Sequence, residues 1–236
     1  MRAYVGTSGW AYSSWNPESS LDWYVKNSGL NAVELNASFY RFPYPNQILA
    51  WARKGRRLHW AVKVHRFVTH VYRFGGKAYS SWRRFRQLFE PLDARVDFYL
   101  FQLPPSSTPA LAPRIKRFLD RSGLGRRAAL EVRNEGWFAP RWADWATELG
   151  VTWVSIDAPV LSREVFNTSG FIYLRMHGRT GWYRHNYSDA ELEEKAAGIL
   201  ASRPKRAYVF FNNDHDMLEN ARTMRRLLEG GKRGPS

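Results

Sequence analysis

The sequence predicts an α/β fold, a single (β/α)8 TIM-type barrel whose parallel strands are surrounded by outer helices. Eight short apolar segments alternate with helical segments along the chain, which is the order of a closed parallel barrel. The apolar segments are rich in β-branched, aromatic and aliphatic residues, as buried parallel strands are. The length of 236 residues is normal for one such barrel. We expect this domain to cover residues 1–229, followed by a flexible basic tail at 230–236.

The predicted strands recur from the N-terminus to the end of the chain and are Tyr4–Gly6, Ala32–Leu35, Trp60–Val64, Asp97–Phe101, Ala128–Val132, Thr152–Ile156, Phe171–Leu174 and Ala207–Phe211. The predicted helices between them carry apolar residues at helical spacing and are Leu21–Lys26, Pro45–Arg53, Ser80–Phe89, Ala112–Leu119, Pro140–Leu149, Asp189–Ala201 and Asp216–Leu228. A doubly wound open sheet is the alternative fold. It predicts a glycine-rich phosphate-binding loop after the first strand, and Gly6-Thr7-Ser8-Gly9-Trp10 is not such a loop.

The composition excludes some classes of chemistry. The chain has no cysteine, so disulfides, thiolate catalysis and zinc–thiolate sites are excluded. The first residues lack the apolar core of a signal peptide, and no apolar run approaches the roughly 18 residues of a membrane span. We therefore expect a cytoplasmic protein with no membrane partner.

The net charge of +15 raises the question of a polyanionic partner. The basic clusters at Arg53–Arg57, Arg126-Arg127 and Arg203–Arg206 precede predicted strands, so we expect them on the N-terminal face of the barrel. Cations at helix C-termini also have an ordinary structural role. We prefer that structural and solubilising interpretation to nucleic-acid binding. The arginines at 83, 84 and 86, on the helix after the third strand, fit either.

Polar side chains follow the strands, where the active sites of α/β barrels lie. The candidate catalytic residues at these strand ends are Glu34, Glu131, Asp157 and His177. The candidate substrate-binding residues are Ser8, Trp10, Asn36, Tyr40, Lys63, His70, Gln102, Arg133, Arg175, Asn212 and Asn213. Residues two apart, such as Glu131 and Arg133, face the same side of a strand, so they enter or leave the barrel together.

The charges of these residues favour a small polar or anionic ligand. Lys63, Arg133 and Arg175 stand among three carboxylates, and guanidinium groups match phosphate or carboxylate in a bidentate way. Glu131 or Glu34 is then the candidate acid or base. The alternative is that these carboxylates form structural ion pairs with the arginines. No cofactor is assigned; a single divalent metal held by Glu131, Asp157 and His177 is a less favoured alternative.

The loops after the strands are rich in aromatic residues, among them Trp10, Tyr12, Tyr40 and Tyr183. They are candidates to stack on sugar rings or bases, or to form a hydrophobic collar over the barrel. The segment Gly178–Tyr187 is a candidate lid.

The chain resembles the YecE-like family, domain of unknown function 72, over most of its length. The matching segments are Gly6-Thr7-Ser8-Gly9-Trp10, residues 33–43, Val62-Lys63, Thr69-His70, residues 101–105, Glu131-Val132-Arg133 with Trp137, Asp157, residues 173–178 and Phe211-Asn212-Asn213. The resemblance implies a barrel related to xylose isomerase and endonuclease IV, and it implies no particular reaction. The family usually has histidine where this chain has Asn134, so a proton carrier is missing there.

The leading hypothesis from the sequence is an enzyme acting on a phosphate- or sugar-containing substrate at the mouth of the barrel. Hydrolysis of a phosphoester is favoured by analogy of fold only. A sugar isomerase or epimerase is a second enzymatic alternative. A non-catalytic nucleic-acid-binding protein that uses its basic helices is the alternative from a different class.

Overall fold

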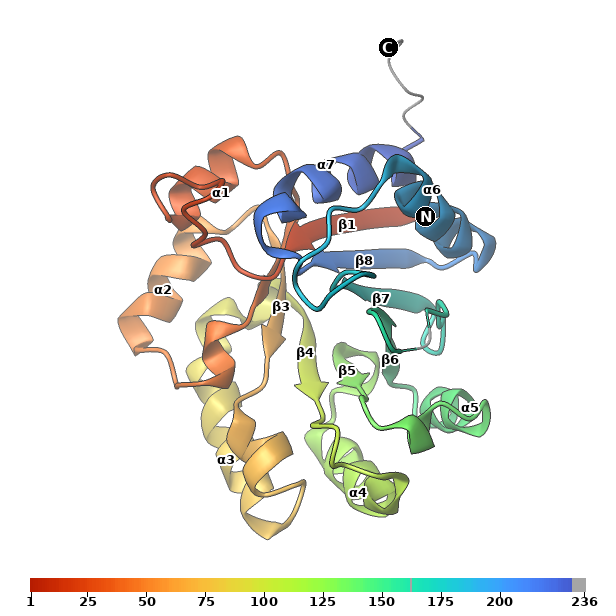
Figure 1. The fold of residues 1–236 in the computed structure, drawn as a ribbon. Coiled ribbons are helices and arrows are strands. Elements are labelled where there is room, and N and C mark those ends of the chain that lie inside the picture. The colour runs from red at the N-terminus through yellow and green to blue at the C-terminus, as the bar shows by residue number, and fades with distance from the viewer. Residues whose placement is uncertain (162, 231–236) are drawn as a thin grey trace.

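Eight parallel strands close into a barrel in the order of the sequence, and β8 pairs with β1 (Figure 1). The computed structural model describes residues 1–161 and 163–230. The strands are β1 (Arg2–Thr7), β2 (Ala32–Leu35), β3 (His59–Lys63), β4 (Val96–Gln102), β5 (Ala128–Glu131), β6 (Thr152–Asp157), β7 (Phe171–Met176) and β8 (Arg206–Phe211). Every segment predicted as a strand is one, and the predicted barrel is confirmed. Of the predicted basic tail, only Gly230 lies within the described residues.

The helices lie on the outside of the barrel and follow it round in sequence order (Figure 1). They are α1 (Leu21–Asn27), α2 (Pro45–Lys54), α3 (Gly76–Leu88), α4 (Ala112–Ser122), α5 (Arg141–Glu148), α6 (Asp189–Ala201) and α7 (Met217–Leu228). Short caps fix several of their ends. Ser188 and Glu191 form a capping box at the start of α6, and α4 ends at Gly123, whose φ of 65° suits glycine.

The expected alternation of strand and helix is wrong at one connection. Between β6 and β7 the described residues, 158–161 and 163–170, contain no helix. The chain instead returns along the outside of β6. The Ser155 hydroxyl accepts from the Phe166 amide, and the Thr168 hydroxyl accepts from the Trp153 amide and donates to the Val151 carbonyl. These side-chain bonds give the backbone partners that compete with helix formation.

The barrel interior is apolar at its N-terminal end and polar at its C-terminal end. An aromatic layer fills the N-terminal end and consists of Tyr4, Phe98, Tyr173 and Tyr208, with the rings of Tyr4 and Tyr208 stacked at 4.7 Å. A second, larger apolar core lies between the strands and the outer helices. Side chains alternate along each strand, so the residues two positions beyond an inward-facing residue also point inward. Beyond the inward-facing Ala32, Ala61, Ala129 and Tyr173 these residues are charged: Glu34, Lys63, Glu131 and Arg175. In the described part of the chain, no helix is long and apolar enough to cross a membrane.

Candidate functional site

Arg175 of β7 forms the centre of the polar end of the barrel. Its Nε and Nη2 donate to the two carboxylate oxygens of Glu34 on β2, at 2.9 and 2.7 Å, and its Nη1 donates to Glu131 on β5 at 2.5 Å. All three side chains are almost completely buried. One guanidinium therefore holds two buried carboxylates and ties three strands of the barrel together.

The Glu34 carboxylate has no oxygen free for a substrate. Besides Arg175, it accepts from the Ser8 hydroxyl and the Tyr173 hydroxyl, each at 2.6 Å. Burial raises the pKa of Glu34, but Arg175 and these hydrogen bonds outweigh burial and hold it below its usual value. Glu34 is thus ionised at neutral pH, and its geometry is that of an anchor for Arg175.

Glu131 is held in a similar way from two sides. It accepts from Arg175 and from Nε of Arg133, the latter at 2.8 Å. Burial raises the pKa of Glu131, but Arg175 and Arg133 outweigh it and keep the pKa well below its usual value. Glu131 is therefore a poor proton donor at neutral pH, although the sequence suggested it as an acid or base. The structural ion pairs weighed as an alternative are present for both glutamates.

A cavity of about 360 Å³ opens above this cluster. Its lining comes from the ends of several strands and the loops that follow them: Tyr12, Asn36, Tyr40, Lys63, Arg133, Arg175, Tyr183, Asn212, Asp214 and Met217. At its floor the cations of Lys63, Arg133 and Arg175 outnumber the carboxylates of Glu34 and Glu131 by one. Asp214, also in the lining, pairs with His215. The floor of the cavity is thus suited to an anion.

Lys63 points into this cavity without a charged partner. Its side chain is buried and its Nζ lies 4.2 Å from the centre of the Phe39 ring. This Nζ donates no hydrogen bond to any residue that the structure describes, and it forms no salt bridge with any of them. Burial lowers the pKa of Lys63 to about 8, helped by Arg175 and opposed by Glu131.

Arg133 also has donors to spare. Only its Nε is used, by Glu131, and the guanidinium lies 4.9 Å from the ring of Trp182. Its Nη1 and Nη2 have no hydrogen-bond partner among residues 1–161 and 163–230. They are available to a bound oxyanion.

His177 is fully buried beside the cavity. Its ring contacts Trp182 and Tyr183, each with centroids 5.4 Å away. Asn212 Nδ2 lies 3.3 Å from Nδ1, whereas Nε2 has no hydrogen-bond partner in the described part of the chain. Burial and Arg175 lower the pKa of His177 far below its usual value, so the imidazole is neutral at physiological pH.

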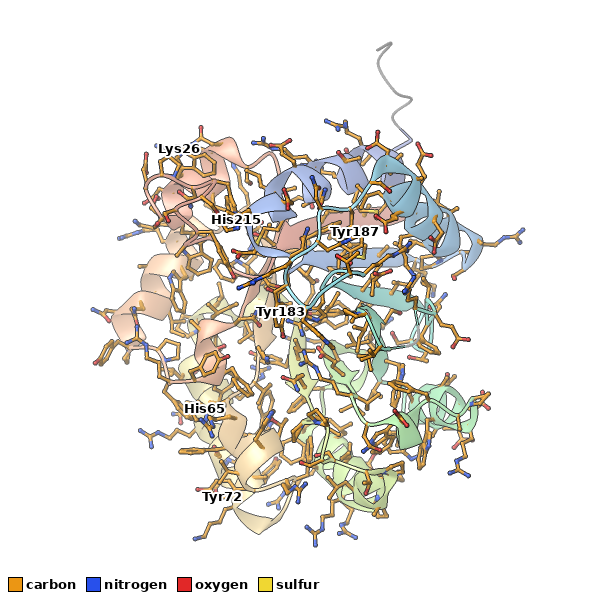
Figure 2. The ribbon with its side chains drawn as sticks, in the orientation of Figure 1. Lys26, His65, Tyr72, Tyr183, Tyr187 and His215 are labelled. Atoms are coloured by element: carbon orange, nitrogen blue, oxygen red, sulfur yellow. The ribbon has the colours of Figure 1, made fainter. Side chains whose placement is uncertain are left out.

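The segment between β7 and α6 covers His177. Tyr183 of this segment lies over the middle of the barrel in Figure 2, whereas Tyr187 lies by β8 toward α6 and His65 lies toward α3. Tyr187 donates to Asp157 at 3.0 Å and accepts from the Gly178 amide at 2.8 Å. The predicted lid, Gly178–Tyr187, is therefore attached at both of its ends.

Asp157 does not join the central cluster. Val154 and Ile156 of β6 face the barrel interior, so Asp157 faces the outer helices. There it pairs with Arg179 at 3.1 Å and with Lys195 of α6 at 3.2 Å. The metal alternative of the sequence analysis is not assembled, because within residues 1–161 and 163–230 no three His, Asp or Glu side chains are placed to hold a metal ion.

Four predicted site residues, Ser8, Glu34, Glu131 and His177, lie beneath or beside the cavity and not in its lining, and four further ones also lie outside the lining. Trp10 packs against Trp51 and Trp60, with ring centroids 5.7 and 5.8 Å away. The remaining three are Gln102, which donates to the Leu103 carbonyl, His70, which packs on Phe39, and Asn213, which donates to the His185 carbonyl and to Asn220. Asn134, where the resemblance leads us to expect histidine, donates to the Pro105 carbonyl. Asn213 thus supports the lid, and Asn134 joins two loops.

Tyr173 and Met217 are site residues that the sequence analysis missed. Tyr173 lies two positions before Arg175 on β7 and binds Glu34, so the same alternation that links Arg175 and His177 indicates it. Met217, at the start of α7, lines the cavity. No pattern in the sequence distinguishes it from an ordinary helix residue.

The fold and site define a class: a TIM barrel with a small, cation-rich cavity at the C-terminal ends of its strands. The chain belongs to the DUF72 family, whose model, described as "Protein of unknown function DUF72", matches residues 4–235. No curated protein matches the sequence.

Solved structures agree with this assignment. A DUF72 family protein from Thermotoga maritima MSB8 is 26% identical, with a TM-score of 0.85, over 97% of this chain and 100% of that one. One from Enterococcus faecalis V583 is 19% identical, with a TM-score of 0.81, over 96% of this chain and 95% of that one. A D-psicose 3-epimerase in the presence of D-fructose is 10% identical, with a TM-score of 0.57, over 98% of both chains. At that identity the epimerase shares the fold alone.

Proposed function

We propose that the chain is a cytoplasmic enzyme that binds a small organic anion, carrying phosphate or carboxylate, at the C-terminal mouth of its barrel. One observation carries this proposal. Lys63 and Arg133 present unused N–H groups to a cavity in which the glutamates are already engaged by arginine. Cations in that position gain most from an oxyanion that enters from solution.

The group best suited to proton transfer is Lys63, and the neutral His177 is suited to hydrogen-bond a ligand. Glu34 and Glu131 are held ionised by Arg175, whereas a general acid or base works best with a pKa near the operating pH. Burial brings the pKa of Lys63 to about 8, and His177 is neutral with an unused Nε2. Acid–base chemistry beside a bound anion suits both enzymatic hypotheses from the sequence, phosphoester hydrolysis and sugar isomerisation.

Replacing Arg133 with methionine tests the anion site. A hydrogen bond to a charged group contributes roughly 1.5–3 kcal/mol, so the affinity for ribose 5-phosphate, measured by titration calorimetry, is expected to fall about 10- to 100-fold. Arg141→Met is the matched control, because Arg141 also stacks on a tryptophan, Trp142 at 5.2 Å, but is exposed on α5. Equal losses in both variants, or no binding of ribose 5-phosphate or inorganic phosphate by the unmodified protein, would contradict the proposal.

Nucleic-acid binding is the alternative that one surface favours. Two grooves on α3 and α4 share Tyr79 and are lined by six arginines in all: Arg83, Arg84, Arg86, Arg114, Arg117 and Arg121. The guanidinium of Arg121 lies 3.8 Å from the Tyr79 ring centre. A basic groove with an aromatic ring is typical of single-strand binding sites.

Binding to a single-stranded oligonucleotide separates the two proposals. Under the nucleic-acid alternative, the double variant Arg83→Gln, Arg84→Gln loses affinity by fluorescence anisotropy at about 0.1 M salt, and Arg133→Met does not. Under the enzyme proposal, the double variant keeps the affinity for ribose 5-phosphate unchanged. Oligonucleotide binding that disappears only in Arg133→Met would exclude the groove as the binding site.

A further inference from the structure

We propose that Lys63 is an amine nucleophile that forms an imine with the carbonyl group of an aldehyde or keto substrate, whose anionic group is held by Arg133 and Arg175. The inference deepens the proposed function and rests on it, because it names the substrate as an anion that also carries a carbonyl carbon. It assigns Lys63 a covalent role, whereas the anion site alone gives it an electrostatic one.

The first support is the contrast between two buried lysines of the same chain. Lys195 is structural: its Nζ pairs with Asp157 at 3.2 Å and donates to the Arg163 carbonyl at 2.6 Å. Lys63 is buried to a similar extent, yet its Nζ has no such partner among the described residues. Buried lysines are rarely left unpaired. No structural ion pair therefore explains why Lys63 is buried at the floor of the cavity.

The surroundings of Lys63 keep its Nζ without a charged partner. The two carboxylates nearest to it in the cluster, Glu34 and Glu131, are taken up by Arg175 and Arg133. The Phe39 ring covers one side of the ammonium group. The backbone is fixed as well, because the Ser38 hydroxyl donates to the Lys63 carbonyl at 2.7 Å. The backbone position of Lys63 is therefore fixed, and its amine is shielded from water.

The protonation state agrees with this geometry. Burial and Arg175 lower the pKa of Lys63 to about 8, so about a tenth of the molecules carry the free amine at pH 7. Desolvation beside another cation is the arrangement that activates a lysine for attack on a carbonyl.

The cavity brings Lys63 and the two arginines close enough to contact the two ends of such a substrate. Lys63 on β3, Arg133 at the end of β5 and Arg175 on β7 line the same space of about 360 Å³. That volume is at the lower end of small-molecule sites. A compact carbonyl compound can therefore reach Lys63 with its carbonyl carbon while its phosphate or carboxylate contacts the two arginines.

The proposed step balances without an added reagent. The free amine of Lys63 attacks the carbonyl carbon, a C–N bond forms, and the π electrons of the carbonyl move to its oxygen. The nitrogen loses one proton and the oxygen gains one, which gives a carbinolamine. The carbinolamine hydroxyl takes up one further proton from solvent and leaves as water, and an iminium ion remains. Oxidant and reductant are both unnecessary, and the iminium acidifies the adjacent carbon for the acid–base chemistry already proposed.

Reductive trapping of the full chain tests the step. The protein is incubated at pH 7 with dihydroxyacetone phosphate, glyceraldehyde 3-phosphate, pyruvate or 2-oxoglutarate, sodium borohydride is added, and peptide mass spectrometry locates the adduct. At least one probe is expected to label Lys63 at least about tenfold more than exposed Lys77 of α3. Excess inorganic phosphate is expected to suppress labelling of Lys63 and not of Lys77.

Two variants separate this inference from the proposed function. Lys63→Arg keeps the positive charge but lacks a nucleophilic amine, so it is expected to lose the adduct at position 63. Lys77→Met is expected to leave labelling at position 63 unchanged. If ribose 5-phosphate binds but no probe labels Lys63 above Lys77, the imine inference is overturned and the anion site stands. If neither anion binding nor labelling occurs, both proposals are overturned.

Discussion

Replacing Arg175 with methionine is expected to lower the free energy of unfolding by about 3–5 kcal/mol, the usual cost of removing one partner from a buried ion pair. Glu34 and Glu131 are both inaccessible to solvent and share Arg175 as a counter-ion. Methionine fills much of the space but leaves Glu34 without a counter-ion and Glu131 with Arg133 alone. Urea unfolding followed by tryptophan fluorescence measures the change.

The pH dependence of this loss identifies its cause. In the unmodified protein the pKa values of both glutamates are lowered, by Arg175 above all, so their stabilising contribution is present above the unfolded-state pKa and is lost as pH falls. In Arg175→Met, burial is expected to raise the pKa of Glu34, whose ionisation then destabilises the fold as pH rises, whereas Arg133 still opposes the effect of burial on Glu131. The difference between the two proteins should be largest near pH 7 and should narrow below about pH 4.

Two further variants make the result specific. Arg141→Met, at an exposed position, should change stability by less than about 0.5 kcal/mol. Adding Glu34→Gln to Arg175→Met should recover part of the loss, because one buried charge is removed. A loss that is independent of pH and unaffected by Glu34→Gln would mean that packing, and not charge, accounts for the role of Arg175.

The barrel was predictable from the sequence because its signal is local. Each strand is a short apolar segment and each outer helix has its own spacing of apolar residues, so no long-range information was needed. The β6–β7 connection differs because its structure depends on bonds from Ser155 and Thr168 to distant backbone groups. Expecting a helix there followed the pattern of the other connections and not a feature of that segment.

The location of the site was predictable, but the partners of its residues were not. The alternation along β7 indicates that Arg175 and His177 point the same way. The alternation does not indicate that Arg175 binds both Glu34 and Glu131. Arg175 is separated from Glu34 by 141 positions and from Glu131 by 44 positions, so these residues meet only when the barrel closes. The roles of these glutamates therefore changed from candidate acid or base to anchors once their hydrogen bonds were known.

The excess positive charge is partly structural at the N-terminal face. Arg127 donates to both oxygens of Asp93 and to the Val96 carbonyl, and Arg206 pairs with Asp97. These contacts link the N-terminal ends of the strands. They support the structural interpretation of those two clusters and leave the α3–α4 arginines as the more exposed group.

Asp157 shows why a strand end alone does not define a site residue. All six residues of β6 are buried, because a parallel strand in a barrel is covered on both faces. The sequence of β6 therefore places Asp157 at the mouth of the barrel without indicating which face it occupies. In the structure it faces α6 and the base of the lid, where it contacts Arg179, Tyr187 and Lys195.

Replacing Asp157 with asparagine is expected to lower the free energy of unfolding by about 3 kcal/mol, because Lys195 and Arg179 lose a buried counter-ion. Since Tyr187 and Arg179 attach the lid through Asp157, diethyl pyrocarbonate should modify the buried His177 about tenfold faster in this variant, as local opening becomes easier. Chemical unfolding and mass spectrometry of the modified peptide measure the two effects.

Glu194→Gln provides the matched control for this prediction. Glu194 also pairs with Arg179, at 2.8 Å, but its side chain is 59% exposed, so its loss should cost less than about 1 kcal/mol and leave His177 protected. If instead Asp157→Asn keeps its stability and the protection of His177 but loses affinity for ribose 5-phosphate, Asp157 acts on the ligand. Such a result would return Asp157 to the catalytic role that its strand-end position suggested, and the face it occupies in this structure would have to change when ligand binds.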